Sequence, residues 1–108
     1  MPLGLKAENV SATSADIAWT ASTGAESYVI RYGVDGQTND RLYYSETSSF
    51  VLNDTVFGGT LAGQKINVCV EAYAKTYTGT TEIDQANNAM KDTADNWSTV
   101  LTIDYPAE

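Results

Sequence analysis

The sequence predicts an all-β domain, an antiparallel sandwich of seven short strands. Threonine (14 residues) and tyrosine (7 residues) are abundant, and both are favoured at half-buried positions of pleated strands. Most of the chain alternates apolar and polar residues with a period of two, whereas a helix repeats about every 3.6 residues. Turn signals containing glycine separate the alternating runs, at Ser22-Thr23-Gly24, Asp35-Gly36, Gly58-Gly59 and Ala62-Gly63.

Each predicted strand has an apolar side that is expected to face the core. The first strand is predicted at 5–10, and the second, at 15–19, has Ala15, Ile17 and Trp19 on its apolar side. The third, at 28–32, has inward residues at alternate positions from Tyr28 and places Arg31 outward. Two shorter strands follow at 41–45 and 49–53. The sixth and seventh, at 66–72 and 101–105, have apolar sides formed by Ile66, Val68, Val70 and Ala72, and by Leu101, Ile103 and Tyr105.

The segment between residues 75 and 96 departs from this pattern, because it is too long for a simple hairpin loop. Thr81 is a suitable helix N-cap there. This predicts a short helix, with two interpretations of its apolar stripe. The stripe either belongs to a lid over one open end of the core, which is the favoured interpretation, or to a binding element that projects from the sandwich. Its members are Ile83, Ala86, Met90, Ala94 and Trp97.

The amino-acid composition excludes several classes of catalytic and metal-binding site. With 108 residues the chain is expected to form one domain, 1–108. It has no histidine and a single cysteine, so catalytic triads with a histidine base, Cys/His zinc sites and internal disulfides are excluded. The net charge of −8 argues against nucleic acid and anionic membrane surfaces as partners. We therefore expect no enzyme activity, no cofactor and no metal.

No stretch resembles a signal peptide or a membrane span. The first five residues lack both a basic and an apolar region, and the most apolar run, at 68–74, is interrupted by Glu71. A bilayer needs about 20 apolar residues. Membrane insertion is not expected.

The order and spacing of these strands resemble those of the fibronectin type III family over most of the chain, from Leu5 to Tyr105. The resemblance is carried by Trp19 at the end of the second strand, by the run 28–36, by the sixth strand and by the closing run 101–105. It implies a seven-stranded immunoglobulin-like sandwich of bacterial or bacteriophage type.

Two features differ from the family pattern. The family usually has a tyrosine at the corner before the sixth strand, following a leucine; here Leu61 is present, but Ile66 stands near the tyrosine position, and 53–60 looks inserted. The 75–96 segment is also longer than the family's loop between the last two strands. The resemblance implies that this segment and the loop at 21–25 lie at the same end of the sandwich, where family members commonly bind partners.

The other candidate sites are interpreted as having no functional role. Two groups of oxygen-bearing residues could ligate calcium, but neither matches an EF-hand loop, so both are interpreted as solvated acidic loops: Asp92, Asp95 and Asn96, and Asp35, Asn39 and Asp40. Cys69 is placed on the outward side of its strand and is interpreted as passive. Several aromatic residues are expected to be exposed, at least two of them from the set Tyr43, Tyr44, Tyr73 and Tyr77.

These observations favour a non-enzymatic structural or binding module. The first interpretation is a small surface or decoration component of a larger assembly, such as a bacteriophage virion, contacting a capsid or tail protein. The alternative is a spacer, carbohydrate-binding or adhesion module of a secreted bacterial enzyme or adhesin. Either places the domain outside the cell or on a virion surface. The residues expected to contact the partner are Thr23, Tyr77, Ile83, Met90 and Trp97.

Overall fold

The computed structural model describes residues 1–38, 41–92 and 95–108. The described residues contain seven strands, as the alternation predicted, and two helices. The strands are β1 (Leu3–Glu8), β2 (Ser14–Thr20), β3 (Ser27–Val34), β4 (Arg41–Ser45), β5 (Ser49–Asn53), β6 (Lys65–Tyr73) and β7 (Leu101–Asp104). The helices are α1 (Asp54–Phe57) and α2 (Glu82–Ala89).

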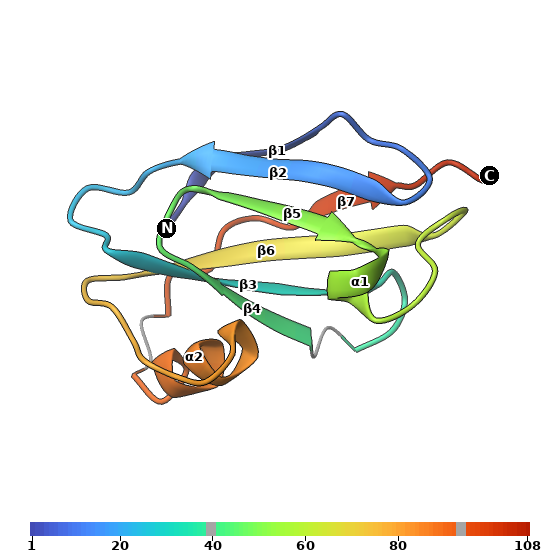
Figure 1. Ribbon diagram of the computed structural model, residues 1–108. Helices are drawn as coiled ribbons and strands as arrows, with labels where there is room; N and C mark the ends of the chain where they lie inside the picture. Colours follow the sequence, from blue (N-terminus) through green and yellow to red (C-terminus); the bar gives the residue numbers. More distant parts are fainter. Residues whose placement is uncertain (39–40, 93–94) are drawn as a thin grey trace.

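The strands form two antiparallel sheets that pack face to face (Figure 1). One sheet has the order β1-β2-β5 and the other has the order β4-β3-β6-β7. β3 lies between β4 and β6, with Ile30 opposite Tyr43 on one side and opposite Val70 on the other. This central position places the loop before β3 and the chain after β6 at the same end of the sandwich.

The core between the sheets is made by the residues that alternation assigned to the inward sides. Ile17 and Trp19 of β2 are buried, as are Tyr28, Ile30 and Tyr32 of β3. The Trp19 and Tyr28 rings meet edge to face, with their centroids 5.2 Å apart. Burial of such side chains supplies most of the stability of a domain of this size.

The corner between β5 and β6 is closed without a tyrosine at the Ile66 position. Residues after β5 form α1, whose first turn is capped by Asn53: its Oδ1 accepts the Val56 N–H at 2.8 Å. The helix ends at Gly58, whose φ of 78° is unstrained only for glycine. The buried Tyr105 hydroxyl donates to the Leu52 carbonyl at 3.0 Å, so a tyrosine from the end of the chain ties down this corner.

Removing that hydroxyl gives a direct test of the corner. Tyr105→Phe is expected to lower the free energy of unfolding by about 1–2 kcal/mol, because the buried Leu52 carbonyl loses its donor. Urea denaturation measures the difference. Tyr32→Phe is the matched control and should cost less, since the Tyr32 hydroxyl lies 3.4 Å from the Val56 carbonyl. If the two variants lose the same free energy of unfolding, the Tyr105 hydroxyl does not stabilise the corner more than the Tyr32 hydroxyl does.

α2 forms as the sequence predicted, with Thr81 as its N-cap: the Thr81 Oγ1 accepts the Asp84 N–H at 3.2 Å. The helix does not close an open end of the core, and it does not project from the sandwich. It lies on the outer face of the four-stranded sheet, below β3 and β4 in Figure 1. Both predicted positions of this segment, over an open end of the core and projecting from the sandwich, are therefore wrong. The second, smaller cluster of buried residues that α2 completes there consists of Val29, Tyr44, Tyr73, Ala86 and Ala89.

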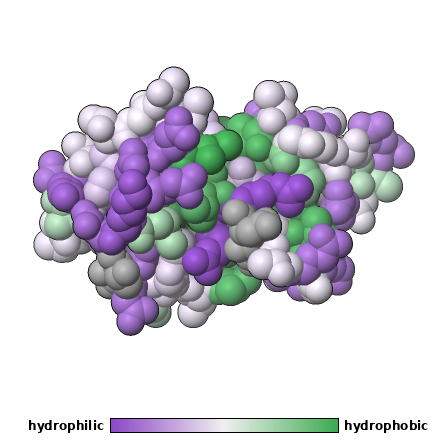
Figure 2. Space-filling view, turned by 90° about the horizontal axis from the view of Figure 1, so that it is seen from below, coloured by the Kyte–Doolittle hydropathy of each residue, from purple (hydrophilic) through white to green (hydrophobic). Residues whose placement is uncertain are grey.

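The apolar stripe is only partly a helix face. Ala86 faces the second cluster, but Ile83 is 52% exposed. Met90 is the C-cap and Trp97 lies outside the helix altogether; Ala94 lies outside the described residues. Figure 2 shows the face that carries α2, where hydrophobic surface gathers near the middle of the view between hydrophilic stretches.

Candidate functional site

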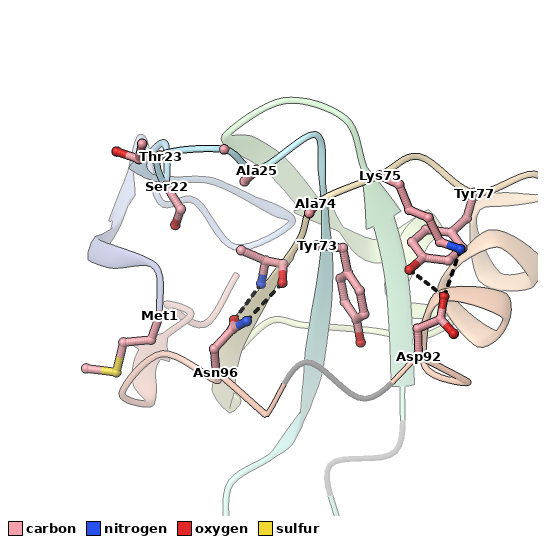
Figure 3. A pocket seen from close by; sticks show the side chains of 12 residues that line it. Met1, Ser22, Thr23, Ala25, Tyr73, Ala74, Lys75, Tyr77, Asp92 and Asn96 are labelled. Atoms are coloured by element: carbon pink, nitrogen blue, oxygen red, sulfur yellow. Dashed lines mark hydrogen bonds and ion pairs between the residues drawn. The ribbon is translucent and has the colours of Figure 1, made fainter.

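A hollow in the described surface lies at the end of the sandwich that holds the loop between β2 and β3. It has a volume of about 500 Å³. Its walls come from parts of the chain that are far apart in sequence: the loop 22–25, the end of β6 with the residues after it, and the two residues Asp92 and Asn96 (Figure 3). Met1 also lines it. We call this hollow the loop-end pocket.

Asn96 fastens one wall of the pocket to β6. Its Oδ1 accepts the Ala72 N–H at 2.9 Å, and its Nδ2 donates to the Ala72 carbonyl at 3.0 Å, so the side chain imitates a neighbouring strand (Figure 3). Ser98 repeats the arrangement two residues later: its N–H donates to the Val70 carbonyl at 2.8 Å, and its Oγ accepts the Val70 N–H. The segment leading into β7 is thus held against β6 largely by side chains.

A polar triad forms the opposite wall. The Lys75 Nζ lies 3.1 Å from the Asp92 Oδ2, and the Tyr77 hydroxyl donates to the same oxygen at 2.9 Å (Figure 3). The Lys75 ammonium and the Tyr77 hydroxyl hold the pKa of Asp92 below its usual range. Burial, reinforced by the bond to Asp92, raises the pKa of Tyr77 to about 12. At neutral pH the triad therefore holds a carboxylate, an ammonium and a protonated phenol.

A buried carboxylate lies behind this wall. Glu71 is only 2% exposed. Its side chain accepts one hydrogen bond from the Tyr73 hydroxyl and a second from the Asn96 N–H, at 3.2 Å. The Tyr73 hydroxyl also lies 3.5 Å from the Met90 sulfur. Burial and the contact with Glu71 raise the pKa of Tyr73. Tyr73 and Glu71 therefore connect the pocket wall to the second cluster beneath α2.

The comparisons with known proteins identify the architecture. No family model and no curated protein matches the sequence. Among solved structures, the chain is similar to the fn3 domain of human collagen alpha-1(XX), with a TM-score of 0.65 and 16% identity over 99% of this chain and 85% of that one. The fold is that of a fibronectin type III domain.

Two further structures support this assignment. The fn3 domain of human contactin 1 gives a TM-score of 0.63 at 14% identity, over 99% of this chain and 77% of that one. The FN5 domain of Drosophila Lar gives 0.58 at 17% identity, over 99% and 96% of the two chains. Fibronectin type III domains are generally non-catalytic modules, many of which bind other proteins. Among the described residues, no helix has the length and apolar character that crossing a bilayer requires.

The fibronectin type III fold separates the five residues that the sequence nominated for partner binding. Thr23 and Tyr77 both line the loop-end pocket. Ile83 lines a different groove, of about 480 Å³, between α1, β4 and α2. Met90 and Trp97 are partly buried against the second cluster. The structure thus brings two of the five together and adds Ser22, Lys75 and Asp92, which were not nominated as partner residues.

The aromatic residues expected on the surface are mostly covered. Tyr44 and Tyr73 are each 4% exposed, because α2 covers the outer face of the sheet on which they lie. Tyr43 packs partly against the main core, close to the Phe50 ring. Of the four tyrosines, only Tyr77 lines the pocket while remaining partly exposed.

Three of the six residues considered as calcium ligands make other contacts. Asp92 belongs to the triad and Asn96 binds the main chain of β6. The Asp35 Oδ1 accepts the Asn67 side-chain N–H at 2.9 Å; Asn39 and Asp40 lie outside the described residues. In the part of the chain that the structure describes, no three carboxylate or cysteine side chains are grouped as a metal site would require.

Cys69 lies on the outward side of β6 as predicted, yet it is only 7% exposed. It pairs with Arg31 across β3 and β6, and the Arg31 guanidinium lies over the Trp97 ring at 4.5 Å from the centroid. Burial raises the pKa of the thiol.

A thiol reagent tests this environment. At pH 8 the folded protein should react with Ellman's reagent at least about tenfold more slowly than the urea-unfolded chain, because both shielding and the raised pKa reduce accessible thiolate. Trp97→Ala should restore part of the rate by removing the ring over Arg31. Equal rates for the folded and unfolded protein would contradict the burial of Cys69.

Proposed function

We propose that this protein is a non-catalytic binding module that contacts its partner through the end of the sandwich carrying the loop-end pocket. Two settings are proposed for it, both outside the cell or on a particle surface. One is a surface component of a larger assembly such as a virion, contacting a capsid or tail protein; the other is a carbohydrate-binding, adhesion or spacer module of a secreted bacterial protein.

The observation that carries the proposal is the pocket itself. Its volume of about 500 Å³ falls within the range that small-molecule and cofactor sites usually have. Its walls are fixed by hydrogen bonds before any partner arrives, which reduces the ordering cost of binding. Both segments proposed as the contact surface, 21–25 and 75–97, contribute to it.

A deletion of the long segment is a poor test, because α2 covers Val29, Tyr44 and Tyr73 and its loss exposes them. Nuclear magnetic resonance of the 15N-labelled chain is sharper. Two probe panels are used: short neutral oligosaccharides and a library of linear peptides. A ligand selected from either panel is expected to shift the amides at 22–25 and 72–77, and not those of the turn at 35–37 at the opposite end.

The outcome also separates the two settings. A peptide ligand at the pocket supports the assembly component, and a sugar ligand supports the carbohydrate-binding module. Ligands that shift only the opposite end, or the absence of any ligand from both panels with a Kd below about 1 mM, would overturn the proposal.

A further inference from the structure

The main-chain groups at the loop-end pocket already have partners. The Ala72 N–H and carbonyl bind the Asn96 side chain. The Tyr73 carbonyl accepts the Glu26 N–H at 2.8 Å, and the Lys75 carbonyl accepts the Ser27 hydroxyl at 2.6 Å. A peptide that adds to a sheet as an extra strand needs a row of free N–H and carbonyl groups. The pocket offers no such row at these residues, so its recognition chemistry lies in side chains.

The side chains at the pocket have hydrogen-bonding capacity to spare. Ser22 and Thr23 line it, and within the described residues neither hydroxyl makes a hydrogen bond. The Lys75 ammonium has three donors, of which Asp92 uses one. The second oxygen of Asp92 is free of bonds to the described residues. The pocket therefore presents hydroxyls, donors and a carboxylate acceptor in close proximity.

The charged side chains at the pocket balance each other, and apolar surface lies among the polar groups. The Lys75 ammonium and the Asp92 carboxylate compensate each other at 3.1 Å. The partly exposed Tyr77 ring stands edge to face against the Tyr73 ring at 5.5 Å between centroids, and the Lys75 ammonium lies over it at 5.2 Å from the centroid. Ala25 and Ala74 add small apolar surface. A ligand that matches this lining has hydroxyls around its rim and an apolar face for an aromatic ring.

We propose that the loop-end pocket binds a short neutral oligosaccharide, an inference that rests on the binding function proposed above. A sugar ring carries hydroxyls that donate and accept at adjacent positions, and Asp92, Lys75, Ser22 and Thr23 offer complementary groups. Its C–H face packs against a tyrosine ring. The chain's net charge of −8 repels acidic polysaccharides and nucleic acid, which favours a neutral sugar over an acidic one.

Titration calorimetry with single, pure sugars tests the class. The probes are neutral hexasaccharides of glucose, mannose, galactose and xylose, with hexagalacturonate as the acidic counterpart. At least one neutral hexasaccharide is expected to bind and to shift the amides at 22–25 and 72–77, while hexagalacturonate does not bind. Asp92→Asn should weaken binding about tenfold or more, because it removes a charge-assisted acceptor.

The control is the same change at a distant ion pair: Asp104→Asn, next to Lys65 at 3.9 Å, should leave the affinity unchanged. A second variant, Ser22→Ala with Thr23→Val, removes the two free hydroxyls without disturbing any hydrogen bond of the fold and should also weaken binding several-fold. Thermal unfolding confirms that each variant is folded.

Each result decides a different question. No neutral sugar bound, or hexagalacturonate bound more tightly, overturns the sugar assignment. If a peptide then shifts the pocket amides and loses affinity in Asp92→Asn, the proposed binding function stands while the sugar class fails. If a sugar binds with the same affinity to the wild type, to Asp92→Asn and to the Ser22/Thr23 variant, the pocket is not the binding site. Both proposals then fail.

Discussion

Glu71→Ala is expected to lower the free energy of unfolding by about 3 kcal/mol. The carboxylate is 2% exposed and accepts hydrogen bonds from the Tyr73 hydroxyl and the Asn96 N–H. Truncation removes the acceptor of the Asn96 N–H, leaves the buried Tyr73 hydroxyl with only the weak Met90 sulfur contact, and opens a void behind the pocket wall. Urea denaturation measures the loss, and 15N spectra should show the Asn96 amide displaced.

Glu71→Gln is the matched variant, because it keeps the shape and one carbonyl acceptor. Its cost should lie between those of the wild type and Glu71→Ala, since the new amide N–H₂ cannot accept the second bond. If Glu71→Ala is as stable as the wild type, the cost of burying the carboxylate cancels its hydrogen bonds, and Glu71 does not hold the pocket wall.

The second large effect is expected at the centre of the four-stranded sheet. Ile30 is fully buried in β3, between Tyr43 of β4 and Val70 of β6. Ile30→Ala should cost about 3–4 kcal/mol, from the lost burial and the cavity left behind. For a domain of this size that lowers the melting temperature by on the order of 15 °C.

Ile83→Ala makes the identical chemical change at a side chain that is 52% exposed on α2. It should alter stability by less than about 0.5 kcal/mol, because little surface is buried and alanine favours a helix. Similar costs for Ile30→Ala and Ile83→Ala would contradict the assignment of the core.

The strands could be predicted because a side chain facing a core imposes a period of two, as at Ala15, Ile17 and Trp19. The start of α2 could be predicted because Thr81 has the side chain that caps a free N–H. The end of that helix could not. Its apolar spacing continued to Trp97, although the chain leaves the helix at Met90 and Asp95 then adopts a φ of 51°.

The second cluster was missed for a different physical reason. Alternation assigns one side of a strand to the core and the other to solvent, so at least two of the four residues Tyr43, Tyr44, Tyr73 and Tyr77 were expected at the surface. A helix on the outer face buries Tyr44 and Tyr73. The uninterrupted apolar run of Tyr28, Val29 and Ile30 was the available signal, because Val29 is fully buried on the outward side.

The pocket was only half predictable. The resemblance to fibronectin type III domains implied that 21–25 and 75–96 share one end, and Thr23 and Tyr77 do line one hollow. The triad of Lys75, Tyr77 and Asp92 depends on the chain returning past the end of β6 after α2, and no local pattern encodes that return.

Because residues 96–98 are hydrogen-bonded to β6, two β6 amides can report on how often this segment detaches from the sheet. The Val70 and Ala72 amides donate to the Ser98 hydroxyl and the Asn96 side-chain oxygen, both at 2.9 Å, rather than to a strand. Their hydrogen exchange with solvent therefore depends on release of this one segment, whereas exchange of β6 amides bonded to β3 requires the sheet to separate. A difference between the two opening free energies measures how independently the pocket wall moves from the sandwich that carries it.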